Sequence, residues 1–373
     1  MWVGIAVLGV TLGLILLESM PRGLIVAECY TQSLAFAIGG IYTIGQGVVL
    51  PGVLFLLMSS FPLLFLYLVQ DRLEFSGVML TCTAKILRRH KGLFILALFM
   101  VLLTVGFCIL AIYLILPPIL RGLADEQNQF DTSYIIFVIF GVFWVQEVMR
   151  NVMHVTSCGV VATWYFAGEA RLPPSPIKSS FTRAVTTSIG SICFGSLLVA
   201  VVRFLRFLVE TSRSAADDNN FLSCIFDCIL HCVESLVSYF NEYAFVHVAV
   251  YGCGYVDAAK KTIALVRQCF FAGIFNDCLA GMATDILTLM IATCVGVAAG
   301  ILTWSVSFGV VMFVVSLFIN ATAFQVVQSA VTTIFVCFAE LPEGLAVSFP
   351  SLYTLLITTD RGYTHHTDGY GAV

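Results

Sequence analysis

Charged side chains are scarce in this chain. Asp, Glu, Lys and Arg make up 11% of its 373 residues, whereas an average soluble domain contains about 25%. Hydrophobic residues make up 60%, and they occur in blocks close to the roughly 20 residues that cross the hydrocarbon core of a bilayer. So few polar residues cannot cover the surface of a soluble protein of this size. The sequence therefore predicts an all-α, polytopic transmembrane helix bundle.

Several functional classes also lack their usual signals. The net charge is -4, and the 18 Lys and Arg residues lie in a few short segments, which excludes a basic surface for nucleic acid. The sequence contains no GxxxxGK[ST], HExxH or GxSxG motif, so we expect no enzyme and no cofactor. Most of the 13 cysteines fall in apolar blocks, and none completes a zinc pattern. We expect free thiols and no metal.

Nine apolar blocks are candidate membrane spans. They cover residues 2–20, 24–48, 50–70, 92–116, 134–167, 186–208, 221–246, 285–303 and 305–337. The first block lacks the basic start and the cleavage site of a signal peptide, so we interpret it as a span. Within residues 1–70, which hold the first three spans, Pro21, Pro51 and Pro62 each mark either a break or a tolerated kink.

Lys and Arg in short loops predict the orientation of these spans. Residues 71–91, 168–184 and 251–284 are rich in Lys and Arg and are expected to be cytosolic, the first of them as an amphipathic segment. The loop 117–133 has more acidic than basic residues and is expected outside. Residues 92–345 then form the core bundle.

The two ends of the chain give further expectations. The polar, glycine-rich residues 346–373 predict a cytosolic, disordered tail. Counting back from the cytosolic segment at 71–91, three spans leave Met1 outside. One additional upstream helix would place the N-terminus in the cytosol, so we expect the natural protein to have an N-terminal part that this chain lacks.

Four sequence blocks carry a resemblance to a known family. They are FWVQEVMRNVMHVTSCGVVATWYFAGE (143–169), FTRAVTTSIGSICFGSLLVAVVRFLRFLVE (181–210), NEYAFVHVAVYGCGYVDAAKKTIALVRQ (241–268) and VCFAELPEG (336–344). In sequence, order and spacing they resemble the choline transporter-like family, over about residues 70–345, and most closely its fungal and protist branch. The resemblance implies a ten-helix protein of the plasma membrane or an organelle membrane. This chain apparently lacks the first helix and the large external loop, which leaves nine spans.

A choline carrier must hold a quaternary ammonium, and aromatic rings do so by cation–π attraction. The block 134–167 is unusually polar, and polar side chains at membrane depth are functional candidates. Its candidates for substrate binding are Trp144, Gln146, Glu147, Asn151, His154 and Tyr165. An alternative places Trp144, Trp164 and Tyr165 in the aromatic belts at the membrane surface.

The block 221–246 supplies two more candidates, Asp227 and Glu234. With His231 they are spaced i, i+4 and i+7 and share one helical face. In a bundle this face would guide a cation or relay protons. In an amphipathic helix on the membrane surface it would simply face water, and both interpretations remain open.

Arg203 and Arg206 lie three residues apart in the block 186–208. Their long side chains can reach the interface, or they can form salt bridges with Asp227 or Glu210. The first interpretation gives them a structural role.

These observations favour a transporter of choline or a related organic cation or amine, acting by a facilitated or gradient-coupled mechanism. The expected partners are this small cation and membrane lipids. The alternative is a non-transporting membrane scaffold or a lipid-handling protein. A channel is disfavoured, because the sequence has no motif that forms a ring of ion ligands.

The topology can be tested with single cysteines in a cysteine-depleted variant. We expect Gln127→Cys to react with an impermeant maleimide on intact cells, because its loop is external, and Arg88→Cys to react only after permeabilisation. The measurement is labelling of the purified protein, with permeabilised cells as the control for reactivity. Labelling of Arg88→Cys but not Gln127→Cys on intact cells would contradict the predicted orientation.

Overall fold

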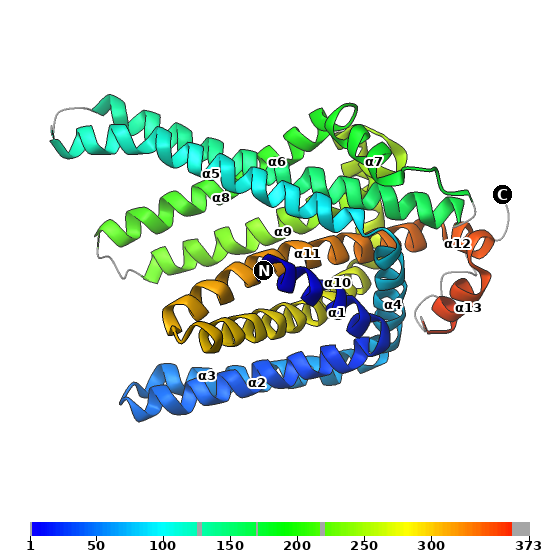
Figure 1. Ribbon diagram of the computed structural model, residues 1–373, viewed down its shortest axis with the longest axis horizontal. Helices are drawn as coiled ribbons and strands as arrows, with labels where there is room; N and C mark the ends of the chain where they lie inside the picture. Colours follow the sequence, from blue (N-terminus) through cyan, green and yellow to red (C-terminus); the bar gives the residue numbers. More distant parts are fainter. Residues whose placement is uncertain (1, 125–128, 169–170, 217–220, 360–373) are drawn as a thin grey trace. The chain divides into compact units, whose positions relative to one another are not determined.

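The computed structural model describes residues 2–124, 129–168, 171–216 and 221–359, and every regular element in these ranges is helical (Figure 1). Nine long helices of the described chain overlap the nine expected spans: α1 (Trp2–Ser19), α2 (Pro21–Gly45), α3 (Val49–Val69), α5 (Gly92–Ala124), α6 (Gln129–Ala167), α8 (Ile189–Ala216), α9 (Phe221–Tyr251), α10 (Tyr255–Thr303) and α11 (Val306–Glu340). The connecting elements are a 3-10 turn (Gln70–Arg72), α4 (Leu73–Arg89), α7 (Pro176–Val185), α12 (Pro342–Ser348) and α13 (Pro350–Thr359). Seven helices of the described chain are long and apolar enough to cross a membrane. The chain is a polytopic all-α membrane protein, as predicted.

Proline and glycine set several helix ends. Pro21 occupies the start of α2, where its missing N–H is not needed, whereas Pro62 lies inside α3. Pro21 therefore marks a break and Pro62 is tolerated within a helix. The turn after α2 places Gly47 at a φ of 84°, in the left-handed region that glycine adopts without steric cost.

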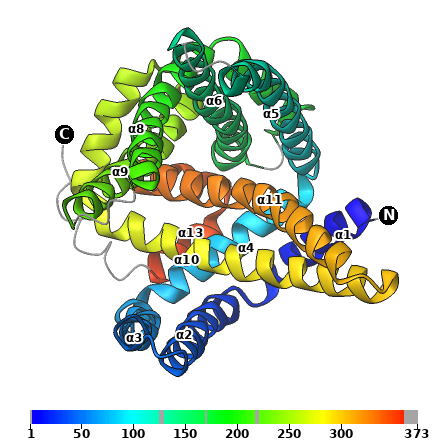
Figure 2. The same cartoon turned by 90° about the vertical axis from the view of Figure 1, so that its left-hand side faces the viewer.

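The chain forms two compact units. Unit 1 contains residues 1–91, 165–170 and 269–373, and unit 2 contains residues 92–164 and 171–268. The expected core bundle, residues 92–345, contributes to both. In unit 1, α2 and α3 lie side by side as a hairpin (Figures 1 and 2).

Helix α4 is the amphipathic element of unit 1, and it runs crosswise to α2 and α3 (Figure 1). It contacts α1, α2, α11 and α13, and it buries an apolar face that includes Met79, Leu80 and Leu87. Both ends carry ion pairs: Glu74 with Arg22 at 2.8 Å, and Arg88 with Glu18 at 2.5 Å. This combination of a buried face and a charged flank is the pattern expected for residues 71–91.

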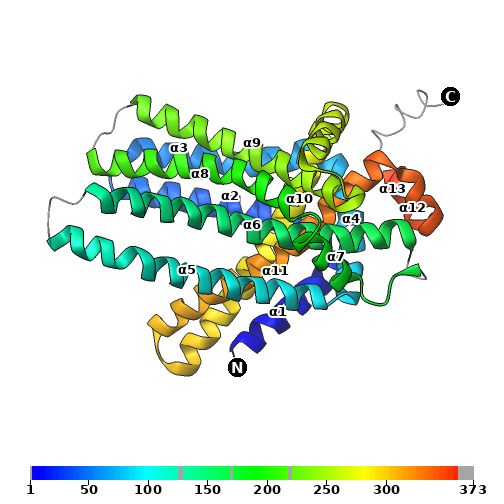
Figure 3. The same cartoon turned by 90° about the horizontal axis from the view of Figure 1, so that it is seen from above.

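In unit 2, α8 and α9 run antiparallel and side by side (Figures 1 and 3). Helix α9 has 31 residues, so it is roughly 46 Å long, against a hydrocarbon core of about 30 Å. It is not among the seven helices that are apolar enough by composition. Its length and its pairing with α8 nevertheless favour a membrane crossing over a position on the membrane surface.

Two regions differ from the expectations. The span expected at 285–303 belongs to the continuous helix α10, whose apolar part runs over Gly273–Thr303. The expected boundary lay later because Lys260, Lys261 and Arg267 assigned residues 251–284 to a cytosolic segment. The tail expected to be disordered from residue 346 contains the end of α12 and all of α13, because Leu345 and Leu356 are buried. The rest of this tail, residues 360–373, lies outside the described residues.

Candidate functional site

Glu147 is the centre of a charged cluster in unit 2. Its side chain is 1% exposed, yet both carboxylate oxygens are bound. Oε1 accepts hydrogen bonds from Arg150 Nη2 at 2.5 Å and Asn151 Nδ2 at 3.2 Å, and Oε2 accepts one from Arg203 Nη1 at 2.6 Å. Two guanidinium groups satisfy a buried carboxylate well, because the hydrogen bonds are charge-assisted. Glu147 is therefore fixed by α6 and α8 together.

The cluster continues onto α9 through the two arginines of α8. Arg203 Nε donates to Glu234 Oε1 at 2.9 Å, and Arg206 Nη1 donates to Glu234 Oε2 at 3.0 Å. Arg206 also contacts Glu210 at 2.8 Å and His231 Nδ1 at 2.8 Å. The predicted salt bridge between Arg206 and Glu210 is thus present.

Glu242 completes the cluster from the other end of α9. Its Oε1 lies 3.5 Å from Arg150 Nη1, and its side chain is 38% exposed. Among the residues that the structure describes, the ion pairs of this cluster join four carboxylates and three guanidinium groups. Counted over these Glu and Arg side chains alone, the cluster has one more negative than positive charge.

Two further predicted residues border the cluster. Asn151 also donates to Ser196 Oγ at 2.9 Å, and the buried His154 has Nε2 3.0 Å from the backbone carbonyl oxygen of Glu242. A carbonyl oxygen only accepts, so this ring nitrogen carries the hydrogen. The structure therefore brings Glu147, Asn151, His154 and Glu234 into one hydrogen-bonded region.

Trp144 and Gln146 form hydrogen bonds with residues of unit 2 that lie outside the charged cluster. The indole N–H of Trp144 donates to the carbonyl oxygen of Cys193 on α8 at 3.1 Å. The amide of Gln146 donates to Cys108 Sγ on α5 at 3.0 Å. Trp144 lies one helical turn before Glu147, and its hydrogen bond fixes the orientation of its ring.

The remaining two candidates are not part of this cluster as described. Tyr165 belongs to unit 1, where its hydroxyl donates to the carbonyl oxygen of Leu341 at 3.1 Å. Tyr165 and Trp164 are both buried in protein, which disagrees with a belt at the membrane surface. The side chain of Asp227 lies outside the described residues.

Sequence reasoning missed several residues of the charged cluster around Glu147. Arg150 and Glu242 were not among the candidates, and Arg203 was given a structural role at the interface. One signal was available, because Arg150 lies three residues after Glu147 in the same apolar block, and opposite charges at this spacing are neighbours on a helix. The contact from Arg203 joins residues 56 positions apart, and no local pattern indicates it.

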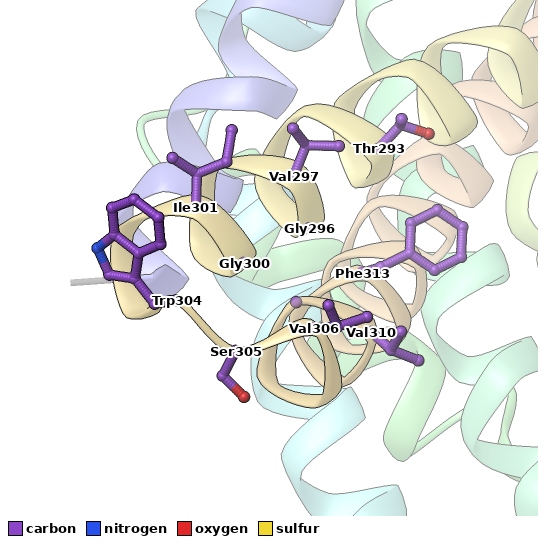
Figure 4. Close-up of a pocket in the computed structure, with 11 residues that line it drawn as sticks. Thr293, Gly296, Val297, Gly300, Ile301, Trp304, Ser305, Val306, Val310 and Phe313 are labelled. Carbon is purple, nitrogen blue, oxygen red and sulfur yellow. The ribbon is translucent and has the colours of Figure 1, made fainter.

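An apolar groove of about 610 Å³ lies between α10 and α11 in unit 1 (Figure 4). Its wall is formed mainly by glycine and aliphatic residues, and none of the residues that line it is charged. The two aromatic side chains, Trp304 and Phe313, point away from each other at opposite ends (Figure 4). This groove lacks the converging rings and the carboxylate that a cation site needs.

Comparison with known proteins gives one consistent result. The sequence profile of the family described as plasma-membrane choline transporter matches residues 53–343. A CTL-like protein of Dictyostelium discoideum is 30% identical over 329 residues, which are 84% of this chain and 57% of that protein. Protein PNS1 of Eremothecium gossypii is 26% identical, with 89% of this chain and 68% of the relative covered. Protein PNS1 of Mycosarcoma maydis is 25% identical, with 92% and 69% covered. The alignment thus spans little more than half of the Dictyostelium relative, and the whole charged cluster lies within the matched range.

The cluster predicts unequal costs for two similar substitutions. Glu147→Gln leaves two guanidinium groups without the buried carboxylate between them, and we expect a loss of about 3–5 kcal/mol in the free energy of unfolding. Glu210→Gln removes a carboxylate that is 47% exposed, and we expect a loss of at most about 1 kcal/mol. Denaturant titration of the purified proteins in detergent measures both. Equal losses would show that Glu147 does not hold the cluster together.

Proposed function

This chain belongs to the choline transporter-like family, and we propose on that premise that it carries choline or a related organic cation across a membrane. It is an integral, multi-pass membrane protein of a transporter family. The observation that carries the proposal is the charged cluster of unit 2, which lies within the residues that match the family and has an excess of one carboxylate. The substrate is the part of the proposal that goes beyond the family.

The physical requirement for such a carrier is to replace the water around a cation. Carboxylates held in place by arginines provide a fixed negative potential without the cost of reorganising solvent. Glu147 and Glu234 already bind two arginines each, so we assign them a positioning role. Glu242 has a single, longer contact with Arg150 at 3.5 Å and is partly exposed. We assign to Glu242 the direct attraction of the cation.

Trp144 supplies the aromatic face in this proposal. Its ring is oriented by the hydrogen bond to Cys193, so a cation that approaches it loses little affinity to ordering of the side chain. Gln146, Asn151 and His154 complete the polar lining along α6. Tyr165 and Asp227 stay predictions for substrate binding, with no contact to this cluster described.

The transport cycle proposed for this site is alternating access, driven by the substrate gradient or coupled to another ion. The second candidate function is a membrane scaffold or lipid-handling protein. One observation favours it: each carboxylate of the cluster has an arginine partner, so the cluster can also serve only to join α6, α8 and α9. Transport by the purified protein separates the two.

Proteoliposomes that contain the purified chain should take up labelled choline with saturable kinetics. An excess of unlabelled choline should abolish this uptake, because both compete for one site, whereas its neutral isostere 3,3-dimethylbutanol should not. Protein-free liposomes measure the leak. Uptake that equals the leak, or that rises linearly without saturation, would favour the scaffold.

Trp144 provides the sharper test of the site. Removing a cation–π contact costs about 0.5–2 kcal/mol, so Trp144→Ala should raise the Kd for choline between about twofold and thirtyfold. Trp144→Phe should keep part of the affinity, because Phe retains a ring face with a weaker quadrupole. The measurement is calorimetry on monodisperse protein, with Trp304→Ala as the matched control, since Trp304 lies on the apolar groove of unit 1. Equal affinities for wild type and both Trp144 variants would remove this residue from the site.

A further inference from the structure

Unit 2 contains a buried amide that lies outside the ion pairs of the charged cluster. Asn241 belongs to α9, and its side chain is 1% exposed. Neither Oδ1 nor Nδ2 of this side chain has a hydrogen-bond partner among the described residues. A buried amide without a partner is costly, because it has lost the water that it bound in the unfolded chain. An amide with both ends unsatisfied therefore requires an explanation.

The neighbours of this amide are a glycine of α8 and two aromatic rings. A Cβ atom added to Gly195 would lie 2.6 Å from Asn241 Oδ1 and 2.7 Å from Phe245 Cζ, and it would collide with the ring of Tyr255. The three side chains therefore meet over one point of α8, where only glycine leaves room for them. The rings of Phe245 and Tyr255 lie edge to face, with their centroids 5.7 Å apart. The unsatisfied amide thus lies beside aromatic groups.

One face of α9 connects this amide to the charged cluster. Glu234, Ser238, Asn241 and Phe245 are spaced i, i+4, i+7 and i+11, so they share a helical face. The hydroxyl oxygen of Ser238 is also buried and has no hydrogen-bond partner among the described residues. Along this face, an ion-paired carboxylate is followed by two unsatisfied polar groups and then by an aromatic ring.

The residues to which we assign the cation lie close to the same point of α8. The indole of Trp144 donates to the carbonyl oxygen of Cys193, which precedes Gly195 by two residues. Glu242 follows Asn241 directly on α9. The unsatisfied amide is therefore adjacent to the proposed transport site and is not part of a separate one.

We propose that Asn241 is a specificity-determining residue of the transport site, and that its amide binds a hydroxyl group of the organic cation. This inference rests on the proposed transport function and narrows the substrate from an organic cation to a hydroxylated one. A hydroxyl group both donates and accepts, so it matches an amide whose acceptor and donor are both unsatisfied. The ammonium end of the substrate is left to Glu242 and Trp144.

The groups around Asn241 favour a neutral hydroxyl group over a metal ion or a second charge. Ca²⁺ and Mg²⁺ take about six oxygen ligands, whereas the Asn241 side chain offers a single carbonyl oxygen. No group of three His, Cys, Asp or Glu side chains that could hold a metal occurs among the residues searched in the described chain. The side chains that meet over Gly195 are an amide and two aromatic rings, and none of them is charged at neutral pH.

Two cations of similar size separate the hydroxyl group from the rest of the substrate. Propyltrimethylammonium has a methyl group in place of the choline hydroxyl and keeps the charge. We expect the wild type to bind choline at least about tenfold more tightly, because the isostere leaves the buried amide unpaired. Asn241→Leu should lose this preference through weaker binding of choline alone. Asn241→Ser, which keeps a donor and an acceptor, should retain part of it. The measurement is calorimetry on the full chain in detergent.

Asn320→Leu is the matched control, since Asn320 is a buried amide of unit 1 whose Oδ1 also lacks a partner among the described residues. It should keep both affinities. Equal binding of the two cations by the wild type would overturn this inference and leave the proposed function intact, and that result needs no variant to fold. An equal loss of both affinities in Asn241→Leu would also overturn it, because the residue would then act through packing. A wild type that binds neither cation would refute the proposed function itself, and this inference with it.

Discussion

Moving an ionised side chain from water into hydrocarbon costs several kcal/mol, and this constraint decides where charge occurs in the described chain. In unit 2 three arginines and four glutamates from α6, α8 and α9 are joined into one cluster. The same contacts fix the three helices to one another, so the cluster serves as structure whatever else it does.

Backbone hydrogen bonding imposes a second constraint, because a lipid-exposed segment must satisfy its own N–H and C=O groups. The described spans satisfy this constraint because they are helical throughout. The tight turn between α10 and α11 uses a residue with positive φ and a capping side chain. At the hairpin of α10 and α11, Trp304 adopts a φ of 52° and Ser305 caps the next helix by accepting a hydrogen bond from the N–H of Phe308 at 3.3 Å. Gly296 and Gly309 let the two backbones approach closely, since an added Cβ on Gly309 would lie 2.9 Å from the carbonyl oxygen of Gly296. The apolar groove beside them follows from this lack of side chains.

The two units contain charge of different kinds. The cluster of unit 2 is held together by internal ion pairs, whereas Glu28 in unit 1 has one hydrogen-bonded oxygen and one oxygen with no hydrogen-bond partner among the described residues.

The sequence by itself determined the class of the protein, the family and the approximate position of most long helices, because hydrophobic length and the spacing of prolines are local properties; α10 is the exception, since it begins at Tyr255 and not at residue 285. It also indicated α6 as the polar span, since Glu147, Asn151 and His154 are ionisable or polar residues within one apolar block. It did not indicate that Arg203 binds Glu147, or that Glu242 lies beside His154, because these contacts join residues far apart in the chain. Glu28 shows the same limit: it is a single acid within its span, and its burial arises only when α2 packs against other helices. Local pattern fixes which helices form, and packing alone decides which of their charges are neutralised.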